Sequence, residues 1–356
     1  MGSMSLPTVW FNKSFSGTLQ QVRALRGHAR VVASHTSPDS LMLREADEAF
    51  LEPRGLVGEA YADYCLAACR AHGVDVFFAQ KELAVIAGRR PDFERQGTRL
   101  VVAGPPETLA LLDDKAAFSA GFPADLGTRV PETRTVTSWP QMEAAIADLR
   151  SRHRGVCMKP AHGVYAAGYR QLTEREDLRR FLAGDVFFMS EAQARALYSA
   201  QPEFPATLIM EHLPGLERSV DCVAWEGELA GAVVRAKVGG LGNVQELQDH
   251  PALLAVVRRM TAHYSLSGLF NVQFREDVAG EPCVLEINPR ASGGLATSMV
   301  SGLNFPWVAA QLALGLTTPA EVPAPRTGLR ITDLKEVVEL PEASLREFVP
   351  ADGQPA

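Results

Sequence analysis

Polar and apolar residues alternate in two segments near the end of the chain, residues 271–274 and residues 286–290. If these segments pair as neighbouring strands, the two-residue period places Gln273, Glu286 and Asn288 on one face and their apolar neighbours on the other. Amide and carboxylate oxygens are hard ligands that suit Mg²⁺, which also takes phosphate oxygens. The pattern therefore predicts a metal site, and the alternative is a solvent-facing polar stripe on an ordinary hairpin.

Arg290 follows this predicted metal site after two residues and precedes Ser292, Gly293 and Gly294. An arginine can hold a phosphoryl group in a bidentate manner, so Arg290 is a candidate catalytic residue. The serine and the glycines open a predicted helix, where backbone N–H groups can receive an anion. We interpret Ser292–Gly294 as a binding site for a substrate carboxylate or phosphate. Its plainer alternative is a loop with an N-cap serine.

Four further cations stand beside predicted turns or loops. Lys115 begins a helix after two aspartates, and Lys159 ends a predicted strand at 155–160, ahead of a glycine-bearing turn at 161–168. A lysine in such a place suits a phosphate contact, although a single lysine is usually a solvated one. Arg235 and Lys237 precede a loop with glycines at 239, 240 and 242. That loop is typical of one that carries cations to a γ-phosphate, but a simple hairpin end has the same features.

Residues 209–221 place two glutamates around a Pro-Gly bend. An extended backbone from Glu211 through His212 to Leu213 would offer N–H and C=O groups to the edge of an adenine ring. Glu217 could accept hydrogen bonds from ribose hydroxyls. The alternative is an inter-strand turn with exposed acids.

The first third of the chain alternates strands and helices, which indicates a parallel sheet with helices on its faces. The glycine fingerprint of dinucleotide binding is absent after the first strand, so an oxidoreductase is rejected. The middle third is expected to form a small α+β unit with capping boxes at Ser138/Gln141 and Thr173/Glu176. The last third predicts a hairpin around Glu226-Gly227-Glu228. The predicted strands are 8–11, 31–34, 74–78, 100–103, 169–172, 219–225, 229–237, 269–274 and 283–288, and the predicted helices include 17–26, 55–71 and 251–264.

Composition limits the classes of function. The 356 residues carry a formal net charge of −7, so binding of nucleic acid or of an anionic membrane through bulk charge is not expected. No apolar run approaches the roughly 18 residues of a membrane span. The five cysteines lack a C-x-x-C pair and are expected to be buried free thiols, which indicates a cytoplasmic protein. The first four residues are interpreted as a cloning remnant. Zinc spacings, a P-loop and a serine-hydrolase elbow are absent from the sequence.

Taken together, these segments resemble the ATP-grasp superfamily, and within it the carboxylate–amine ligases and the ATP-binding halves of carbamoyl-phosphate-synthetase-like enzymes. The resemblance implies an α/β and α+β fold with an N-terminal Rossmann-like parallel sheet, a small α+β lid domain and a C-terminal, mainly antiparallel sheet with helices. The expected domains are residues 1–112, residues 113–209 with a linker helix and the lid, and residues 210–356 with the metal and phosphate site.

The resemblance also implies roles for the candidate residues. Lys115 and Lys159 would contact the α- and β-phosphates of ATP. The ion or ions would be Mg²⁺, with two expected and Mn²⁺ as a substitute, and Glu286 would bridge them. The remaining roles are adenine contacts by Glu211, His212 and Leu213, a ribose contact by Glu217, catalysis by Arg290, Lys237 and Arg235, metal binding by Gln273, Glu286 and Asn288, and substrate contacts by Ser292, Gly293 and Gly294. The loop after Lys159 departs from the family because it is poorer in glycine and carries the bulky Tyr165.

The function implied is an ATP-dependent carboxylate–amine ligase. It would activate a small carboxylic acid, with an amino acid as the first candidate, as an acylphosphate that an amine attacks. Two alternatives stay open: an enzyme that activates bicarbonate as carboxyphosphate, and a non-catalytic ATP-binding regulatory protein. The expected partners are small-molecule carboxylate and amine substrates, without nucleic acid or membrane, and a homodimer is common in the family.

Overall fold

The computed structural model describes residues 6–13, 17–163, 168–239, 243–334, 336–339 and 345–350. Tyr165, the glycines at 240 and 242 and the first four residues therefore lie outside the described residues. Contacts divide the chain into a larger unit (residues 1–110, 218–272 and 287–356) and a smaller unit (residues 111–217 and 273–286). The three expected domains, with boundaries after residues 112 and 209, stay a prediction.

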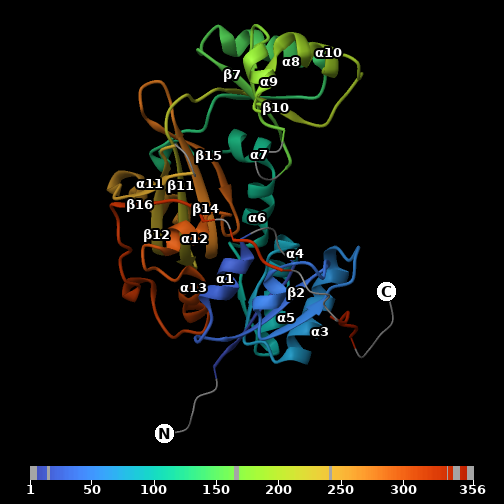
Figure 1. The fold of residues 1–356 in the computed structure, drawn as a ribbon, viewed down its shortest axis with the longest axis vertical. Coiled ribbons are helices and arrows are strands. Elements are labelled where there is room, and N and C mark those ends of the chain that lie inside the picture. The colour runs from blue at the N-terminus through green and yellow to red at the C-terminus, as the bar shows by residue number, and fades with distance from the viewer. Residues whose placement is uncertain are drawn as a thin grey trace. The chain divides into compact units, whose positions relative to one another are not determined.

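The larger unit begins with a five-stranded parallel sheet in the order β3-β2-β1-β4-β5. Figure 1 draws this part of the chain in blue and labels β2 in it. The apolar residues of α3 recur at helical spacing, and Tyr61, Cys65 and Ala68 are all buried. The strands are β1 (Thr8–Phe11), β2 (Arg30–His35), β3 (Glu48–Leu51), β4 (Val76–Phe78) and β5 (Arg99–Val101). The helices are α1 (Thr18–Ala24), α2 (Met42–Glu45), α3 (Gly58–His72), α4 (Leu83–Gly88), α5 (Arg90–Arg95) and α6 (Pro106–Asp113).

A six-stranded sheet in the order β15-β14-β11-β12-β13-β16 follows in the second half of the chain. The predicted hairpin joins β11 to β12, and its two turn residues, Glu226 and Gly227, both have positive φ, as a tight two-residue turn requires. The strands are β11 (Glu217–Trp225), β12 (Glu228–Lys237), β13 (Gln245–Gln248), β14 (Gly268–Glu276), β15 (Pro282–Asn288) and β16 (Leu329–Ile331). The helices are α11 (Pro251–His263), α12 (Leu295–Met299) and α13 (Phe305–Ala313), with a 3-10 turn at Pro319–Glu321.

Side chains of α12 and α13 pack in one apolar cluster with residues of both sheets of the larger unit. Phe305 and Ala309 on α13 contact a cluster that includes Val9 of β1 and Val233 of β12. Burial of these side chains holds the antiparallel strands in place, and with them the polar residues on the same face.

The smaller unit is built on a mixed five-stranded sheet in the order β6-β10-β7-β8-β9. Met142 and Leu149 on α8 pack against Val156 of β7 and Ile209 of β10 and form its core. The strands are β6 (Thr133–Val136), β7 (Val156–Pro160), β8 (Arg170–Thr173), β9 (Phe188–Ser190) and β10 (Thr207–Glu211). The helices are α7 (Lys115–Ala120), α8 (Trp139–Arg150), α9 (Leu178–Leu182) and α10 (Glu191–Tyr198), with a 3-10 turn at Ala124–Leu126.

Both predicted capping boxes are wrong. Ser138 precedes α8, but its side chain makes no capping bond, and Gln141 accepts a hydrogen bond from the N–H of Thr137 instead. The helix expected at Thr173 begins later, because Asp177 caps α9 by accepting hydrogen bonds from two backbone N–H groups. Aspartate is a better N-cap residue than threonine, so the helix begins after Asp177 and not after Thr173.

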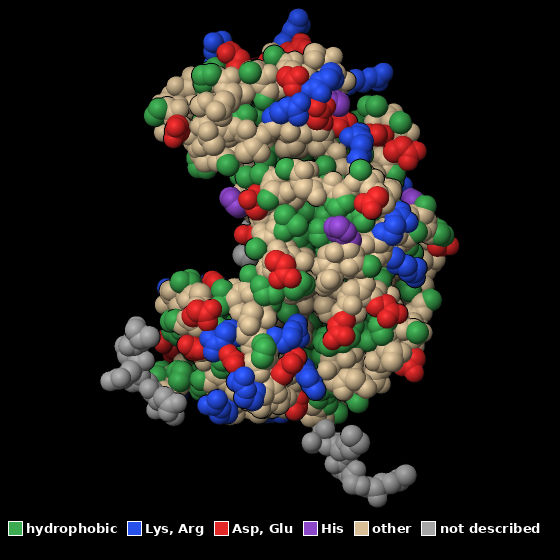
Figure 2. All heavy atoms as spheres, turned by 180° about the vertical axis from the view of Figure 1, so that it is seen from behind, with side chains coloured by type: hydrophobic (Ala, Val, Ile, Leu, Met, Phe, Trp, Pro, Cys, Tyr) green, Lys and Arg blue, Asp and Glu red, His purple; other side chains and the backbone are tan. Residues whose placement is uncertain are grey.

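All five cysteine side chains are buried, as expected from the sequence. On the face drawn in Figure 2, lysine and arginine side chains are interspersed with aspartate and glutamate side chains. Within the described part of the chain, the helices are too short or too polar to cross a membrane.

Candidate functional site

Lys115, Lys159 and Glu286 come together in the smaller unit, although they are far apart in the sequence. The Lys159 ammonium lies 3.9 Å from the Glu286 carboxylate, and the lysine side chain is only 15% exposed. Burial lowers the pKa of Lys159, the Glu286 carboxylate opposes that effect, and the nearby Lys115 ammonium adds to it. Lys115 donates a hydrogen bond to the Gly163 carbonyl at 2.7 Å. Two cations therefore lie near each other, and Glu286 is the carboxylate that pairs with one of them, Lys159. This surplus of positive charge suits an anion.

The start of α7 explains how Lys115 reaches this place. Asp114 caps the helix by accepting hydrogen bonds from the N–H groups of Ala116 and Ala117 at 2.9 and 3.0 Å. The cap fixes the first turn, and the lysine is the first helical residue. Lys159 is delivered by β7, where it pairs with Leu208 of β10.

Glu211 is buried at the end of β10 and takes part in an ion pair. Arg129 donates to both of its carboxylate oxygens, at 2.7 and 3.0 Å, and the Glu132 N–H donates a longer bond at 3.3 Å. Burial alone would raise the pKa of Glu211, but the Arg129 guanidinium and this N–H lower it overall. The side chain thus anchors the strand end. The Glu211 N–H donates to the Glu132 carbonyl at 2.9 Å, so only the Glu211 carbonyl, which the Cys157 thiol contacts at 3.7 Å, is left to meet a ligand.

The Arg129–Glu211 pair predicts a pH-dependent stability. In an Arg129→Met variant, a buried carboxylate loses its charged donor, which costs about 1 to 3 kcal/mol of unfolding free energy at pH 7. A carboxylate whose pKa is lowered by folding stabilises the fold fully at pH values above its ordinary pKa of 4.5. This contribution is lost as the pH falls through the lowered pKa. The gap between wild type and variant should therefore close below about pH 4.

Urea unfolding at pH 7 and at pH 4 measures this gap. Arg134→Met is the matched control, because Arg134 is 41% exposed and pairs with the surface acids Glu132 and Asp148. A gap of equal size at both pH values would contradict the assignment to Glu211.

The residues after Glu211 run as an extended segment. The His212 N–H donates to the Gly155 carbonyl at 2.9 Å, and its imidazole lies 3.1 Å from the Tyr169 hydroxyl. Leu213 is 3% exposed, and its N–H has no hydrogen-bond partner among the described residues. Buried backbone N–H groups are almost always bonded, so this one indicates a site for an external acceptor. Glu217 lies farther along, with the Arg275 guanidinium 3.9 Å from its carboxylate.

The polar residues expected to bind metal lie on β14 and β15, which are neighbours in the sheet. Gln273, Glu286 and Asn288 are half-buried, while Val272, Phe274 and Ile287 between them are buried. The alternation predicted for these strands is thus present, and three oxygen donors without nitrogen or sulfur ligands fit Mg²⁺. Among the residues that the structure describes, no group of three or more His, Cys, Asp and Glu side chains could hold a metal ion. The predicted set contains one carboxylate and two amides, so the metal role stays a prediction.

Arg235 lies in the larger unit, where its side chain is 3% exposed and forms an ion pair with Asp221. Its Nε donates to Asp221 Oδ2 at 2.8 Å, Nη1 donates to Gln245, and Nη2 donates to Ser219 at 3.2 Å and to Ser292 at 3.0 Å. We name this set the Asp221–Arg235 network; it also contains Asn271 and Ser298, which donate to Asp221 at 2.9 and 2.6 Å.

Ser292, Gly293 and Gly294 connect β15 to α12. Ser292 is buried, and its hydroxyl accepts hydrogen bonds from Arg235 and from the Gly294 N–H at 3.2 Å. Gly293 is exposed, with open space where a side chain would be. Arg290, half-buried, precedes them and bonds the Ala291 carbonyl at 3.4 Å. An exposed glycine backbone can receive an anion, and the substrate contact expected of Ser292, Gly293 and Gly294 stays a prediction.

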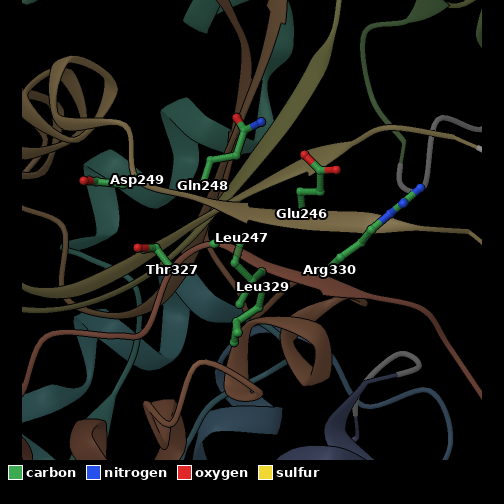
Figure 3. Close-up of a pocket in the computed structure, with 8 residues that line it drawn as sticks. Glu246, Leu247, Gln248, Asp249, Thr327, Leu329 and Arg330 are labelled. Carbon is green, nitrogen blue, oxygen red and sulfur yellow. The ribbon is translucent and has the colours of Figure 1, made fainter.

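Lys237 ends β12 and is exposed. Strand alternation puts it on the same face of β12 as Arg235. Residues of the neighbouring strands β13 and β16 and of the segments beside them line a groove. In Figure 3 the side chains of Glu246 and Gln248 lie on one side of β13 and that of Leu247 on the other. The predicted site residues are absent from the lining of this groove.

Sequence reasoning missed Arg129, Asp221 and Asn271. Asp221 shares the face of Glu217 and Ser219 on β11, and Asn271 shares the face of Gln273 on β14, so alternation could have found both. No local signal exists for Arg129, because its partner Glu211 lies 82 residues away.

Residues 203–337 match the model of a protein family described as ATP-grasp in the biosynthetic pathway with Ter operon. Carnosine synthase 1 of Gallus gallus is 35% identical over 143 residues, which cover 35% of this chain. The chain spans about 15% of the length of that relative.

Solved structures resemble nearly the whole chain. An L-amino acid ligase from Bacillus licheniformis is 15% identical, with a TM-score of 0.58, and the match covers 91% of this chain and 78% of that one. N5-carboxyaminoimidazole synthetase from Staphylococcus aureus with ADP is 14% identical, with a TM-score of 0.61 and coverages of 91% and 81%. The biotin carboxylase domain dimer of the Hydrogenobacter thermophilus 2-oxoglutarate carboxylase, with MgADP, ADP and bicarbonate, is 15% identical, with a TM-score of 0.59 and coverages of 88% and 70%. These likenesses confirm the predicted fold class.

Proposed function

We propose that this protein is an ATP-dependent ligase that joins a small carboxylic acid, first of all an amino acid, to an amine. The match of residues 203–337 to an ATP-grasp family model and the likeness of the fold to that of an L-amino acid ligase support this proposal. The observation that carries the nucleotide part is that the buried Lys159 lies near a second cation, Lys115, while Glu286 is 3.9 Å from its ammonium.

The two lysines have the chemistry to hold phosphate oxygens of ATP. A buried lysine with few protein partners binds an anionic ligand strongly. Its ammonium has already lost most of its water on folding, so ligand binding adds little further desolvation cost. The N–H of Leu213, which has no partner among the described residues, would donate to a ring nitrogen of adenine, and the Glu211 carbonyl would accept from the exocyclic amine. Glu217 would bind the ribose.

Gln273, Glu286 and Asn288 would hold Mg²⁺, and Mn²⁺ would fit the same donors. When bound, the metal neutralises charge on the phosphates of ATP. Arg290 would hold the oxygens of the transferred phosphoryl group.

The reaction needs two transfers, because oxide is too poor a leaving group for an amine to displace from a carboxylate. First a carboxylate oxygen of the acid takes the γ-phosphoryl group from ATP, and ADP leaves. Next the amine nitrogen attacks the acyl carbon, phosphate leaves with the electron pair of the broken C–O bond, and the amine loses a proton. The work of the protein is to position these groups and to neutralise their charge.

An amino acid is the favoured acid because the relatives named above include an L-amino acid ligase and a carnosine synthase. Bicarbonate is the second candidate, since one structural neighbour was solved with that anion.

ADP release tests the proposal. Mg²⁺–ATP is supplied with a panel of amino acids, singly and in pairs, and separately with bicarbonate. Turnover that needs a pair, with an amide product in the mass spectrum, is the expected result. Turnover that needs only bicarbonate would replace the amino acid by the second candidate. ATP binding without turnover under every condition would contradict the ligase and leave the non-catalytic regulatory protein.

A further inference from the structure

A buried charged side chain, that of Arg235, packs against the connection from β15 to α12. The guanidinium of Arg235 lies directly under Gly294, so closely that a Cβ atom at this glycine would meet Nη1 at 2.6 Å and the central carbon at 2.8 Å. Real Cβ atoms do not approach other atoms so closely. Position 294 therefore has to be glycine for Arg235 to keep its place, although the backbone there, with φ of −97°, is one that any residue can adopt.

The Asp221–Arg235 network forms hydrogen bonds with residues at both ends of this connection. Arg235 donates to Ser292 at its beginning, and Ser298 on α12 donates to Asp221 at 2.6 Å. Gly17, just before α1, also lies against it, since a Cβ there would stand 3.4 Å from the Ser292 carbonyl oxygen. A charge pair that is almost fully buried has little freedom to move, because each partner would leave the other without a counter-charge.

The same contacts separate Arg235 from solvent. All three nitrogen atoms of its guanidinium donate to protein side chains, and 3% of the side chain is exposed. The Arg235 guanidinium could reach a phosphoryl group only if these buried hydrogen bonds were broken. We infer that Arg235 is a positioning residue that, together with Asp221, holds Ser292–Gly294 in the shape that receives the substrate carboxylate. This inference rests on the proposed function only in naming that ligand.

Two variants disturb the contact from opposite sides. Gly294→Ala pushes a methyl group into the guanidinium, and Arg235→Lys keeps the charge but loses the fork that reaches Ser219, Gln245 and Ser292 together. Because the ammonium group of lysine is smaller than the guanidinium group of arginine, the double variant has room for the methyl group that alanine adds at position 294. Gly88→Ala is the matched control, since its Cβ would meet its nearest neighbour, Pro106, at an ordinary 3.8 Å.

Amide hydrogen exchange of a peptide covering residues 290–299 is the first readout, because the N–H groups of Gly294, Leu295 and Thr297 are bonded within this segment. Each single variant should exchange about tenfold faster there, with other peptides unchanged, and the double variant should be no faster than either single one. Unchanged exchange in both single variants, or purely additive acceleration in the double variant, would overturn the inference.

Kinetics with the most active amino acids of the panel are the second readout. A loop that only receives the carboxylate should raise the KM for that acid about tenfold in each variant, with kcat and the KM for ATP within about threefold of wild type. A fall in kcat of a hundredfold in Arg235→Lys, with normal exchange, would instead place Arg235 in contact with the reacting groups. If the panel gives no turnover, the proposed function fails, while the exchange experiment still decides for or against the positioning role.

Discussion

A Glu286→Gln variant is expected to lose ATP turnover by about a thousandfold while it remains folded. Glutamine has nearly the same shape, but it removes the only carboxylate among the three residues proposed to hold Mg²⁺. It also removes the counter-charge that lies 3.9 Å from Lys159. Without that carboxylate the pKa of the buried lysine falls further, and its ammonium becomes a weaker partner for phosphate.

ADP release under the conditions that give turnover in the wild type measures this effect. Glu246→Gln is the matched control, because strand alternation puts Glu246 of β13 on the opposite face of the sheet from Gln245 and Arg235. We expect it to keep turnover within about twofold. A Glu286→Gln variant as active as this control would refute the metal role of Glu286 and with it the proposed site.

An Asp221→Asn variant is expected to lose about 3 to 5 kcal/mol of unfolding free energy, because it leaves the Arg235 guanidinium buried without a counter-charge. Asp221 is fully buried and accepts hydrogen bonds from Arg235, Asn271 and Ser298. Asparagine keeps the shape but gives up the charge, and one of its ends is a donor where Asp221 only accepts.

Urea unfolding followed by tryptophan fluorescence measures this loss, since Trp10, Trp225 and Trp307 all belong to the larger unit. The control is Asp148→Asn, which removes a surface partner of Arg134 and Arg152 that is 45% exposed, and it should cost less than about 1 kcal/mol. Asp221→Ala combined with Arg235→Met removes both buried charges and should cost less than Asp221→Asn alone. A loss for Asp221→Asn no larger than that of the surface control would show that the pair is not desolvated.

Features written in consecutive residues could be predicted from the sequence. The two-residue alternation of β14 and β15, the positive-φ turn at Glu226 and Gly227, and the helical spacing of α3 are all present in the structure. Each depends on backbone geometry that repeats within a few residues, so the amino-acid order alone carries the information. Neither predicted capping box is present, because side chains a few residues away form other bonds. Asp177 caps the helix that was expected to begin at Thr173, and Gln141 accepts a hydrogen bond from the N–H of Thr137.

The surroundings of the candidate residues were decided by the tertiary structure. Lys115, Lys159 and Glu286 are far apart in the sequence, and only the packing of α7, β7 and β15 in the smaller unit brings Lys159 near both of the other charges. Arg235 looked like a mobile cation beside a glycine loop, and folding buries it against Asp221 and under Gly294. Whether a charged residue meets solvent, a ligand or a buried partner depends on which distant strands and helices cover it, and that burial sets both its pKa and its freedom to move.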